Sequence, residues 1–301
     1  QCGDSSVEAA VATNTGISVY DRGTSCYLVV SAVAAEGDDT QTGYGYSVGR
    51  SPEEIDLSKA ANDAVERATR LLGATKPTSA HLTVIFEPRI TATLLSILAG
   101  TLDGESVLKG RSMFAERLGE EVSVPGLTLV DDPTDAESFG ARNFDGEGLA
   151  TRRNVLVSDG VLRMFLYNTY AARRAGTVST GSARRGGFKG MPGTGARALT
   201  VVPGVLSPEK IVADTEDGLI VQSVTGVHSG VNAISGDFSV GAEGLRVRNG
   251  AIAGPVREVT VASTIQRMLQ SIVAVGSDLE RLPGSAAGVT LAIADVAMSG
   301  A

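Results

Sequence analysis

Residue types used in nucleophilic catalysis occur in a glycine-rich stretch, residues 218–255. His228, Asp237 and Ser239 lie in it and supply an imidazole, a carboxylate and a hydroxyl. A hydrolase built on them would use Ser239, or Thr180 from earlier in the chain, as nucleophile and Asp237 or His228 as base. No nucleophile-elbow motif accompanies them. A loop that lines a substrate site and a tightly turned connection between strands therefore stay open as alternatives.

Side chains that bind transition metals are few. His81 and His228 are the two histidines, and Cys2 and Cys26 are the two cysteines. A catalytic zinc site takes three protein ligands, most often histidines. Because the two histidines lie far apart in the sequence, we expect no cofactor and no catalytic zinc held by this chain alone.

The acidic residues between 131 and 147 offer a different chemistry. Asp131, Asp132, Asp145 and Glu147 carry the oxygen ligands that Mg²⁺ and Ca²⁺ prefer, but no loop has the spacing of a calcium-binding hand. Asp145 and Glu147 would suit acid–base catalysis if burial separated their pKa values. The glycines beside them favour a turn with solvated charges instead.

The composition limits which classes of binding partner and which cellular compartment suit this chain. The net charge of −8 over 301 residues disfavours nucleic acid, since phosphate binding needs clustered Lys and Arg. No segment approaches the ~20 apolar residues of a membrane span, and the start lacks the apolar run of a secretion signal. Two cysteines make no disulfide framework, so we expect a cytoplasmic location. The one basic cluster is set among glycines and favours a solvated loop: Arg184, Arg185, Lys189 and Arg197.

The first half of the chain contains the elements that must position these residues. Ser51-Pro52-Glu53-Glu54 has the form of a capping box, and it begins a helix that Gly73 ends. The apolar face of this helix is small, which predicts close packing on a sheet. A buried strand at 81–86 precedes a second helix at about 88–102. An antiparallel meander is expected before them, with strands at 10–12, 17–20 and 26–34 and turns at 14–16 and 21–23.

The second half contains more strands and hairpins. Asp159-Gly160 and Asn249-Gly250 each mark a two-residue hairpin turn. Residues 132–148 predict a polar loop and residues 182–196 a mobile one. The pattern predicts an α+β fold with a large mixed, mainly antiparallel β-sheet and flanking helices. Further expected elements are strands at 127–131, 198–202, 256–261 and 289–297, and helices at 112–118, 207–214 and 263–275.

Several short motifs occur together in a fixed order. They include Asp159-Gly160-Val161-Leu162, Gly236-Asp237-Phe238-Ser239, Val247-Arg248-Asn249-Gly250 and Val275-Gly276-Ser277-Asp278. As a set, from about Thr15 onward, the chain resembles the TldD/PmbA family. The resemblance implies a C-terminal β-rich core at 121–301. It also implies a strand-rich segment with two helices at 1–120, the remnant of an N-terminal half without its usual N-terminal domain, whose strands lie at the edge of the large sheet.

The resemblance also bears on zinc. Catalytic subunits of the family carry a His-Glu-x-x-x-His motif, in which two imidazoles reach Zn²⁺ and the Glu serves as base. The matching stretch here, residues 94–101, has Ser96, Ile97 and Thr101 at the three chemical positions, and residues 283–301 contain no Cys to match the family's additional ligand. The chain thus resembles the PmbA/TldE-like subunit, which lacks zinc. A TldD-like partner would supply the zinc, and this chain would shape the access channel for unfolded or small peptides.

The resemblance places candidate peptide contacts after the first hairpin. Asn168, Tyr170, Ser179 and Thr180 are expected to face the substrate passage, together with His228, Asp237 and Ser239 of the glycine-rich stretch. The alternative is that these polar groups satisfy neighbouring backbone.

Two other functions remain open. One is a stand-alone homodimer that binds a peptide or small ligand without cleaving it. The other is a peptidase- or hydrolase-related enzyme of a natural-product pathway, and the sequence does not distinguish such a pathway from general proteolysis.

Overall fold

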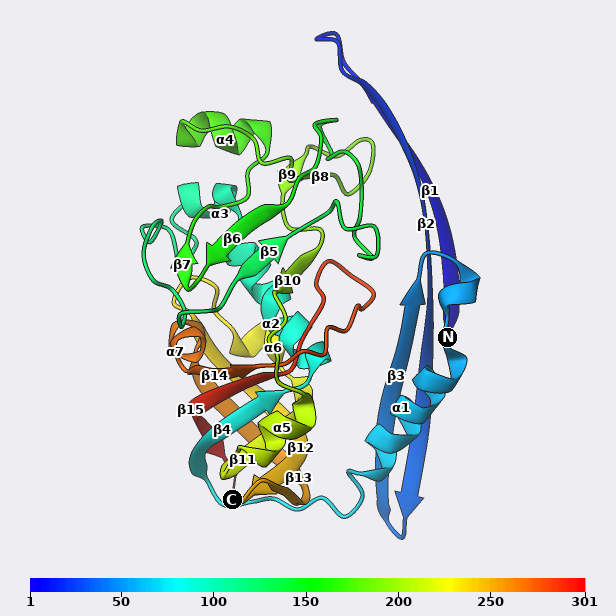
Figure 1. Cartoon of the computed structure of the whole chain (residues 1–301), viewed down its shortest axis with the longest axis vertical. Helices are drawn as coiled ribbons and strands as arrows, with labels where there is room; N and C mark the ends of the chain where they lie inside the picture. The colour runs from blue at the N-terminus through cyan, green and yellow to red at the C-terminus, as the bar shows by residue number, and fades with distance from the viewer. Residues whose placement is uncertain (301) are drawn as a thin grey trace.

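A three-stranded antiparallel sheet forms the N-terminal part of the computed structural model, which describes residues 1–300 (Figure 1). Its strands are β1 (Cys2–Ala12), β2 (Ser18–Glu36) and β3 (Asp39–Gly49). The antiparallel meander is confirmed only in part, because the strands expected at 17–20 and 26–34 are one strand, β2, and the third strand is β3. The turn expected at 21–23 is wrong, because Gly23 lies inside β2 and pairs with Val7 of β1. At the end of this hairpin β1 is largely exposed and β2 alternates between exposed and half-buried residues, so no fully buried position marks these residues as a strand. Within residues 1–300 no strand pairing joins this sheet to the large one, so the expected place at its edge is also wrong.

The helix after this sheet packs closely on it. α1 (Leu57–Thr69) buries Ala60, Ala64 and Ala68 against β3. The small apolar face predicted from the sequence is confirmed. The expected capping box is wrong, because Ser51 makes no side-chain cap and precedes a separate 3-10 turn, η1 (Pro52–Glu54). The chain extends again at Ile55, and the side chain of Asp56 then caps α1 by accepting from the N–H of Lys59.

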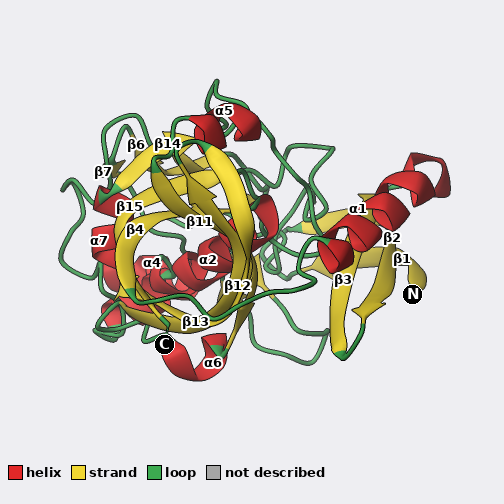
Figure 2. Ribbon diagram, turned by 90° about the horizontal axis from the view of Figure 1, so that it is seen from below, coloured by secondary structure: helices red, strands yellow, loops and turns green. Residues whose placement is uncertain are grey.

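The large sheet confirms the expected fold class, α+β with a mixed, mainly antiparallel sheet. Its strand order is β13-β12-β11-β4-β15-β14, and β11 with β4 is the one parallel pair among residues 1–300. β13 also pairs with β15, so the sheet curls round on itself (Figure 2). The strands are β4 (Ala80–Phe86), β11 (Asp217–Thr225), β12 (Asp237–Arg248), β13 (Ala251–Thr264), β14 (Ile272–Val275) and β15 (Leu291–Ser299).

The neighbouring strands β11, β4 and β15 of this sheet are buried on both faces. On the inner face Phe86, Leu219 and Leu291 join the main core, which also includes the buried leucines of α2 (Pro88–Thr101). On the outer face Ile85 and Ile220 pack with residues of the short helix α5 (Pro208–Ala213). The alternation places successive side chains on opposite faces, as a strand requires.

The remaining elements form a cap above the curled sheet (Figure 1). Asp159 and Gly160 have positive φ values of 50° and 80°, and Asn249 and Gly250 of 50° and 75°, so both predicted hairpin turns are confirmed. The cap contains α3 (Gly104–Leu108), β5 (Leu129–Asp131), β6 (Asn154–Ser158), β7 (Val161–Leu162), α4 (Thr169–Ala175), β8 (Ala183–Arg184), β9 (Gly193–Thr194) and β10 (Leu199–Val201).

Two helix predictions are wrong. Residues 112–118 form turns, and the helix of this region is α3, which the side chain of Asp103 caps. The helix expected at 263–275 ends early: α7 spans Ile265–Gln270, and the residues after it pair with β15 as β14. Tertiary pairing decides that second case, because the β-branched Ile272, Val273 and Val275 suit a strand as well as an apolar helix face.

The segment 182–196 is not one irregular loop, since β8 and β9 pair across it. α6 (Val227–Gly230) is a single turn in the glycine-rich stretch. Among residues 1–300 no helix is both long enough and apolar enough to cross a lipid bilayer.

Candidate functional site

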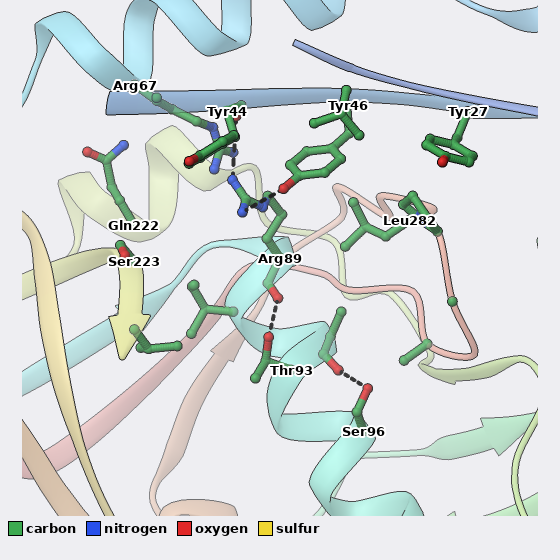
Figure 3. Close-up of a pocket in the computed structure, with 18 of the residues that line it drawn as sticks. Tyr27, Tyr44, Tyr46, Arg67, Arg89, Thr93, Ser96, Gln222, Ser223 and Leu282 are labelled. Carbon is green, nitrogen blue, oxygen red and sulfur yellow. Dashed lines mark hydrogen bonds between the residues drawn. The ribbon is translucent and has the colours of Figure 1, made fainter. Parts of the chain in front are cut away.

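A cavity of about 630 Å³ lies between the N-terminal sheet, α2 and the large sheet (Figure 3). We call it the α2 cleft. Tyr44 and Tyr46 of β3 line one wall, and α2 lines another through Arg89, Thr93 and Ser96. The remaining walls come from β11, β12 and the loop at 282–286. Its volume lies in the range of small-ligand sites, about 300–1,000 Å³.

Arg89 is the most prominent charge of the cleft. Its guanidinium lies 4.5 Å from the ring centroid of Tyr46, and it donates to the Tyr46 hydroxyl (3.3 Å) and the Tyr44 carbonyl (3.4 Å) (Figure 3). Burial lowers the pKa of Arg89 from its ordinary value. No carboxylate among residues 1–300 lies within ion-pair distance of it, whereas nearby Arg67 pairs with Glu87 at 3.1 Å. Arg89 is therefore a half-buried cation that makes no ion pair within residues 1–300, although the more distant Glu280 and Glu87 favour its charged form.

Gln222 of β11 adds an unsatisfied amide to the lining of the cleft. It is only 5% exposed, yet neither its Nε2 nor its Oε1 has a hydrogen-bond partner within residues 1–300. Gln222 is the extra residue of a β-bulge, because Val221 pairs with Gly244 and Ser223 with Glu243. Bulges re-aim side chains and occur often beside functional sites.

The lack of partners at Gln222 has a measurable consequence. A buried amide without hydrogen bonds costs about 1–3 kcal/mol, and methionine has nearly the same shape without polar atoms. We expect Gln222→Met to raise the free energy of unfolding by about 1 kcal/mol in urea denaturation. Gln41→Met is the control, because Gln41 does donate to Asp39 (2.9 Å) and should lose stability. A loss of stability in Gln222→Met would show that its amide is satisfied.

The residues matched to the zinc motif lie on α2 but do not fit a metal. Ser96 Oγ donates to the carbonyl of Ala92 (2.8 Å), and Thr101 Oγ1 donates to that of Leu98 (2.8 Å). Ile97 packs against the core. Ser96 lines the cleft, whereas Thr101 is fully buried. Both hydroxyls are thus used within the helix, and an alkyl group occupies the position of the base.

Other metal-binding groups do not replace them. Within residues 1–300 no three His, Cys, Asp or Glu side chains are grouped so that they could hold an ion. His81 lies 3.1 Å from Asp295, and His228 is exposed on α6. The residues present therefore give no basis for a zinc-dependent step within this chain.

The first group of predicted peptide contacts lies outside the cleft. Asn168 is buried, caps α4 through Ala171 N (2.8 Å) and donates to the Pro192 carbonyl (2.9 Å). Tyr170 is exposed and accepts from Arg174. Ser179 and Thr180 both donate to the Tyr167 carbonyl at 3.1 Å. Apart from Tyr170, these side chains bond to neighbouring backbone, which was the alternative interpretation.

The second group is exposed and is not assembled into a catalytic unit. Asp237 and Ser239 lie on the exposed face of β12, on either side of the buried Phe238. Asp237 accepts a hydrogen bond from Ser235 Oγ (2.6 Å). In the part of the chain that the structure describes, neither Ser239 nor Thr180 hydrogen-bonds to His228 or Asp237. None of the seven predicted contacts lines the α2 cleft. The nucleophile–base hypothesis therefore has no geometric support here.

The acidic residues after β5 organise loops. Asp145 Oδ1 accepts from the N–H groups of Glu147 (2.9 Å) and Leu149 (3.0 Å), and its Oδ2 accepts from Ala183 N (3.0 Å). Glu147 accepts from Thr169 N (2.8 Å) and Oγ1 (2.7 Å). These carboxylates act as acceptors for the protein's own donors.

The basic residues of the glycine-rich loop bond to backbone as well. Arg184 donates to the Ala196 carbonyl (2.6 Å), Arg185 to that of Gly146 (2.6 Å) and Arg197 to that of Ala183 (3.2 Å). They therefore hold the loops of the cap together, which is a more specific role than the solvated loop that the sequence suggested.

Two family models match nearly the full chain. The model of the PmbA/TldA metallopeptidase central domain matches residues 2–72, and that of the C-terminal domain matches residues 79–300. The chain belongs to the PmbA/TldD metallopeptidase family. The two models meet where the chain passes from α1 towards β4, whereas the division expected from the sequence lies at residue 120.

Relatives within the PmbA/TldD family agree with this. The chain is 31% identical to metalloprotease PmbA of Escherichia coli O157:H7, over 82% of this chain and 53% of that protein. It is 30% identical to a metalloprotease of Methanothermobacter thermautotrophicus, over 83% and 56%. The crystal structure of TldE from Thermococcus kodakarensis superposes with a TM-score of 0.93 at 25% identity, covering 99% of this chain and 68% of that one. The chain thus spans about half the length of these two curated relatives.

Three residues of the α2 cleft were not predicted from the sequence. Arg89 looks like an ordinary solvated charge after Pro88, and Gln222 lies within an apolar alternation that hides the bulge. Glu243 stands alone among glycines. The signal that was available is Tyr44-Gly45-Tyr46, whose period of two places both rings on one face of a strand.

Proposed function

We propose that this chain is the metal-free, TldE-like subunit of a two-subunit TldD/TldE-type peptidase. A TldD-like partner supplies the zinc, and this chain shapes the channel through which unfolded or small peptides reach it in the cytoplasm. The observation that carries the proposal is the combination of PmbA/TldD-family domains with an α2 that bears Ser96, Ile97 and Thr101 at the zinc positions. The fold is that of the family, while the donors at those positions cannot serve a metal.

The α2 cleft supports a role in guiding peptide. β3 is an edge strand of its sheet, and Figure 1 draws it on the side that faces the large sheet. Its residues Thr42, Tyr44 and Tyr46 line the cleft. An extended peptide can add to such an edge through main-chain hydrogen bonds, which give affinity without demanding a particular sequence.

Reconstitution tests the proposal. We expect the purified chain to hold no stoichiometric zinc by elemental analysis and to leave an unstructured peptide uncleaved. Adding a TldD-like subunit should give a hetero-complex in size-exclusion chromatography and zinc-dependent cleavage. The partner alone is the control.

Two results would count against this function. Zinc-dependent cleavage by the purified chain would remove the metal-free role. Failure to form a complex with any TldD-like subunit would favour the alternative, a homodimer that binds peptide or another small ligand by itself. The α2 cleft is formed within one chain, and this observation keeps that alternative open.

A further inference from the structure

The α2 cleft is lined by one unpaired side-chain charge of each sign. Arg89 has no carboxylate within 4.0 Å, and Glu243 has neither an ion pair nor a side-chain hydrogen bond within residues 1–300. The two do not pair with each other, although both line the cleft. A partly buried cation and a carboxylate that are held apart are costly unless something compensates them.

The two charges lie on different elements that fix them in place. Arg89 is on the first turn of α2, where the helix dipole adds to its positive potential. The ring of Tyr46 and the carbonyl of Tyr44 hold its guanidinium. Glu243 is on β12 and pairs in register with Ser223, directly beside the bulge at Gln222. The positive and the negative group of the cleft thus belong to α2 and to the large sheet.

Gln222, the bulge residue before Ser223 on β11, provides a third polar group in the lining of the α2 cleft. Its amide has a donor and an acceptor side by side, and both lack partners. A peptide unit presents the complementary acceptor and donor. Because both amide atoms of Gln222 are buried, the side chain must turn towards the cleft to meet them, and the new hydrogen bonds would relieve the cost of the unsatisfied amide.

From these groups we propose that the α2 cleft binds short peptides with both ends free, the α-carboxylate on Arg89, the α-ammonium on Glu243 and a peptide amide on Gln222. This rests on the proposed function and deepens it, because it selects small peptides at a site without metal. A dianionic phosphate suits the cleft less well, since it would meet a single unpaired guanidinium and be repelled by Glu243. Inorganic phosphate therefore serves as a competitor in the test.

Calorimetric titration of the chain with trialanine tests the assignment. We expect binding of free trialanine, and at least tenfold weaker binding both of N-acetyl-trialanine and of trialanine amide. In Glu243→Gln, acetylation should cause no further loss. In Arg89→Gln, amidation should cause no further loss. Each comparison combines one side-chain substitution with one blocked peptide terminus and therefore isolates the interaction between that side chain and that terminus. A general loss of affinity would weaken free and blocked peptides alike and could not produce the expected result.

Matched controls use charges away from the cleft. Arg163→Gln and Glu116→Gln change exposed residues that make no ion pair within residues 1–300, and both should keep wild-type discrimination between free and blocked peptides. If Arg89→Gln does not fold, the blocked peptides on wild type and Glu243→Gln still decide. Equal affinity for free and blocked peptides, no binding of trialanine at millimolar concentration, or displacement by equimolar phosphate would overturn the inference.

The titration is independent of zinc and of a partner. Loss of peptide binding with partner-dependent cleavage intact would overturn this inference and leave the proposed function standing. Peptide binding without any partner-dependent cleavage would support this inference and count against the proposed function.

Discussion

Replacing Gly45 by alanine should lower the free energy of unfolding by about 2 kcal/mol or more. A Cβ at Gly45 would lie 1.9 Å from the Ala60 carbonyl oxygen and 2.9 Å from Ala64 N. These atoms belong to the backbone of α1, so no side-chain rotation can relieve the clash. The helix must move away from β3, and the contacts of Ala60 and Ala64 with the sheet are then lost.

The same change should also weaken peptide binding in the α2 cleft. Tyr44 and Tyr46 flank Gly45 on β3, and Arg67 of α1 lines the cleft as well. A shift of α1 against β3 would displace the wall that holds Arg89. We therefore expect Gly45→Ala to reduce peptide binding as well as the midpoint of urea denaturation.

Gly100→Ala is the matched control. Gly100 lies on α2, and a Cβ there would meet no atom within 4 Å. Because glycine is costly inside a helix, this variant should gain about 0.5–1 kcal/mol. The same chemical change is thus expected to have opposite signs at the two positions. Equal effects would mean that the distance between α1 and β3 is not limited by their backbones.

Replacing Asp131 by alanine should cost about 2–4 kcal/mol. Asp131 is 1% exposed, and its Oδ1 accepts from the N–H groups of Arg197 (2.8 Å) and Ala198 (2.7 Å). Alanine would leave both donors without this acceptor. Asp131→Asn retains it and should lose much less, so the difference between the two variants in urea denaturation measures these hydrogen bonds. Equal losses would show that the charge, and not the acceptor, is what matters.

The pH dependence of these variants follows from burial. Desolvation raises the pKa of Asp131 above its ordinary value, although the two N–H donors oppose the shift. Below the pKa of the unfolded state the residue is protonated in both states and contributes nothing. As the pH rises from there through the raised pKa of the folded state, the buried charge increasingly costs stability. The stability of Asp131→Asn relative to wild type should therefore rise across that window and then level off.

Local patterns were enough to predict several elements of the fold. The alternation in β4 and the small apolar face of α1 are properties of consecutive residues, and both predictions are confirmed. The two hairpin turns follow from Asp-Gly and Asn-Gly, because few other residues accept positive φ at both positions. The motifs placed the chain in its family before its fold was known.

Predictions failed where distant parts of the chain compete. The expected helix at 263–275 gives way to β14 because β15, which comes later in the sequence, offers it a partner. The turn expected at 21–23 is absent because β1 pairs across that segment. Propensity describes what a segment prefers in isolation, and a neighbouring strand can outweigh it.

The sequence by itself determined which chemistry α2 lacks, since Ser96, Ile97 and Thr101 are visible without any structure. Only the tertiary structure decided which chemistry the cleft has. Gln222 and Glu243 come from the consecutive strands β11 and β12, whereas Arg89 comes from α2, far earlier in the chain, and a bulge of one residue sets where Gln222 lies. A pairing register is fixed by the packing of the sheet as a unit, so the meeting of these three residues is a property of the fold and of no local pattern.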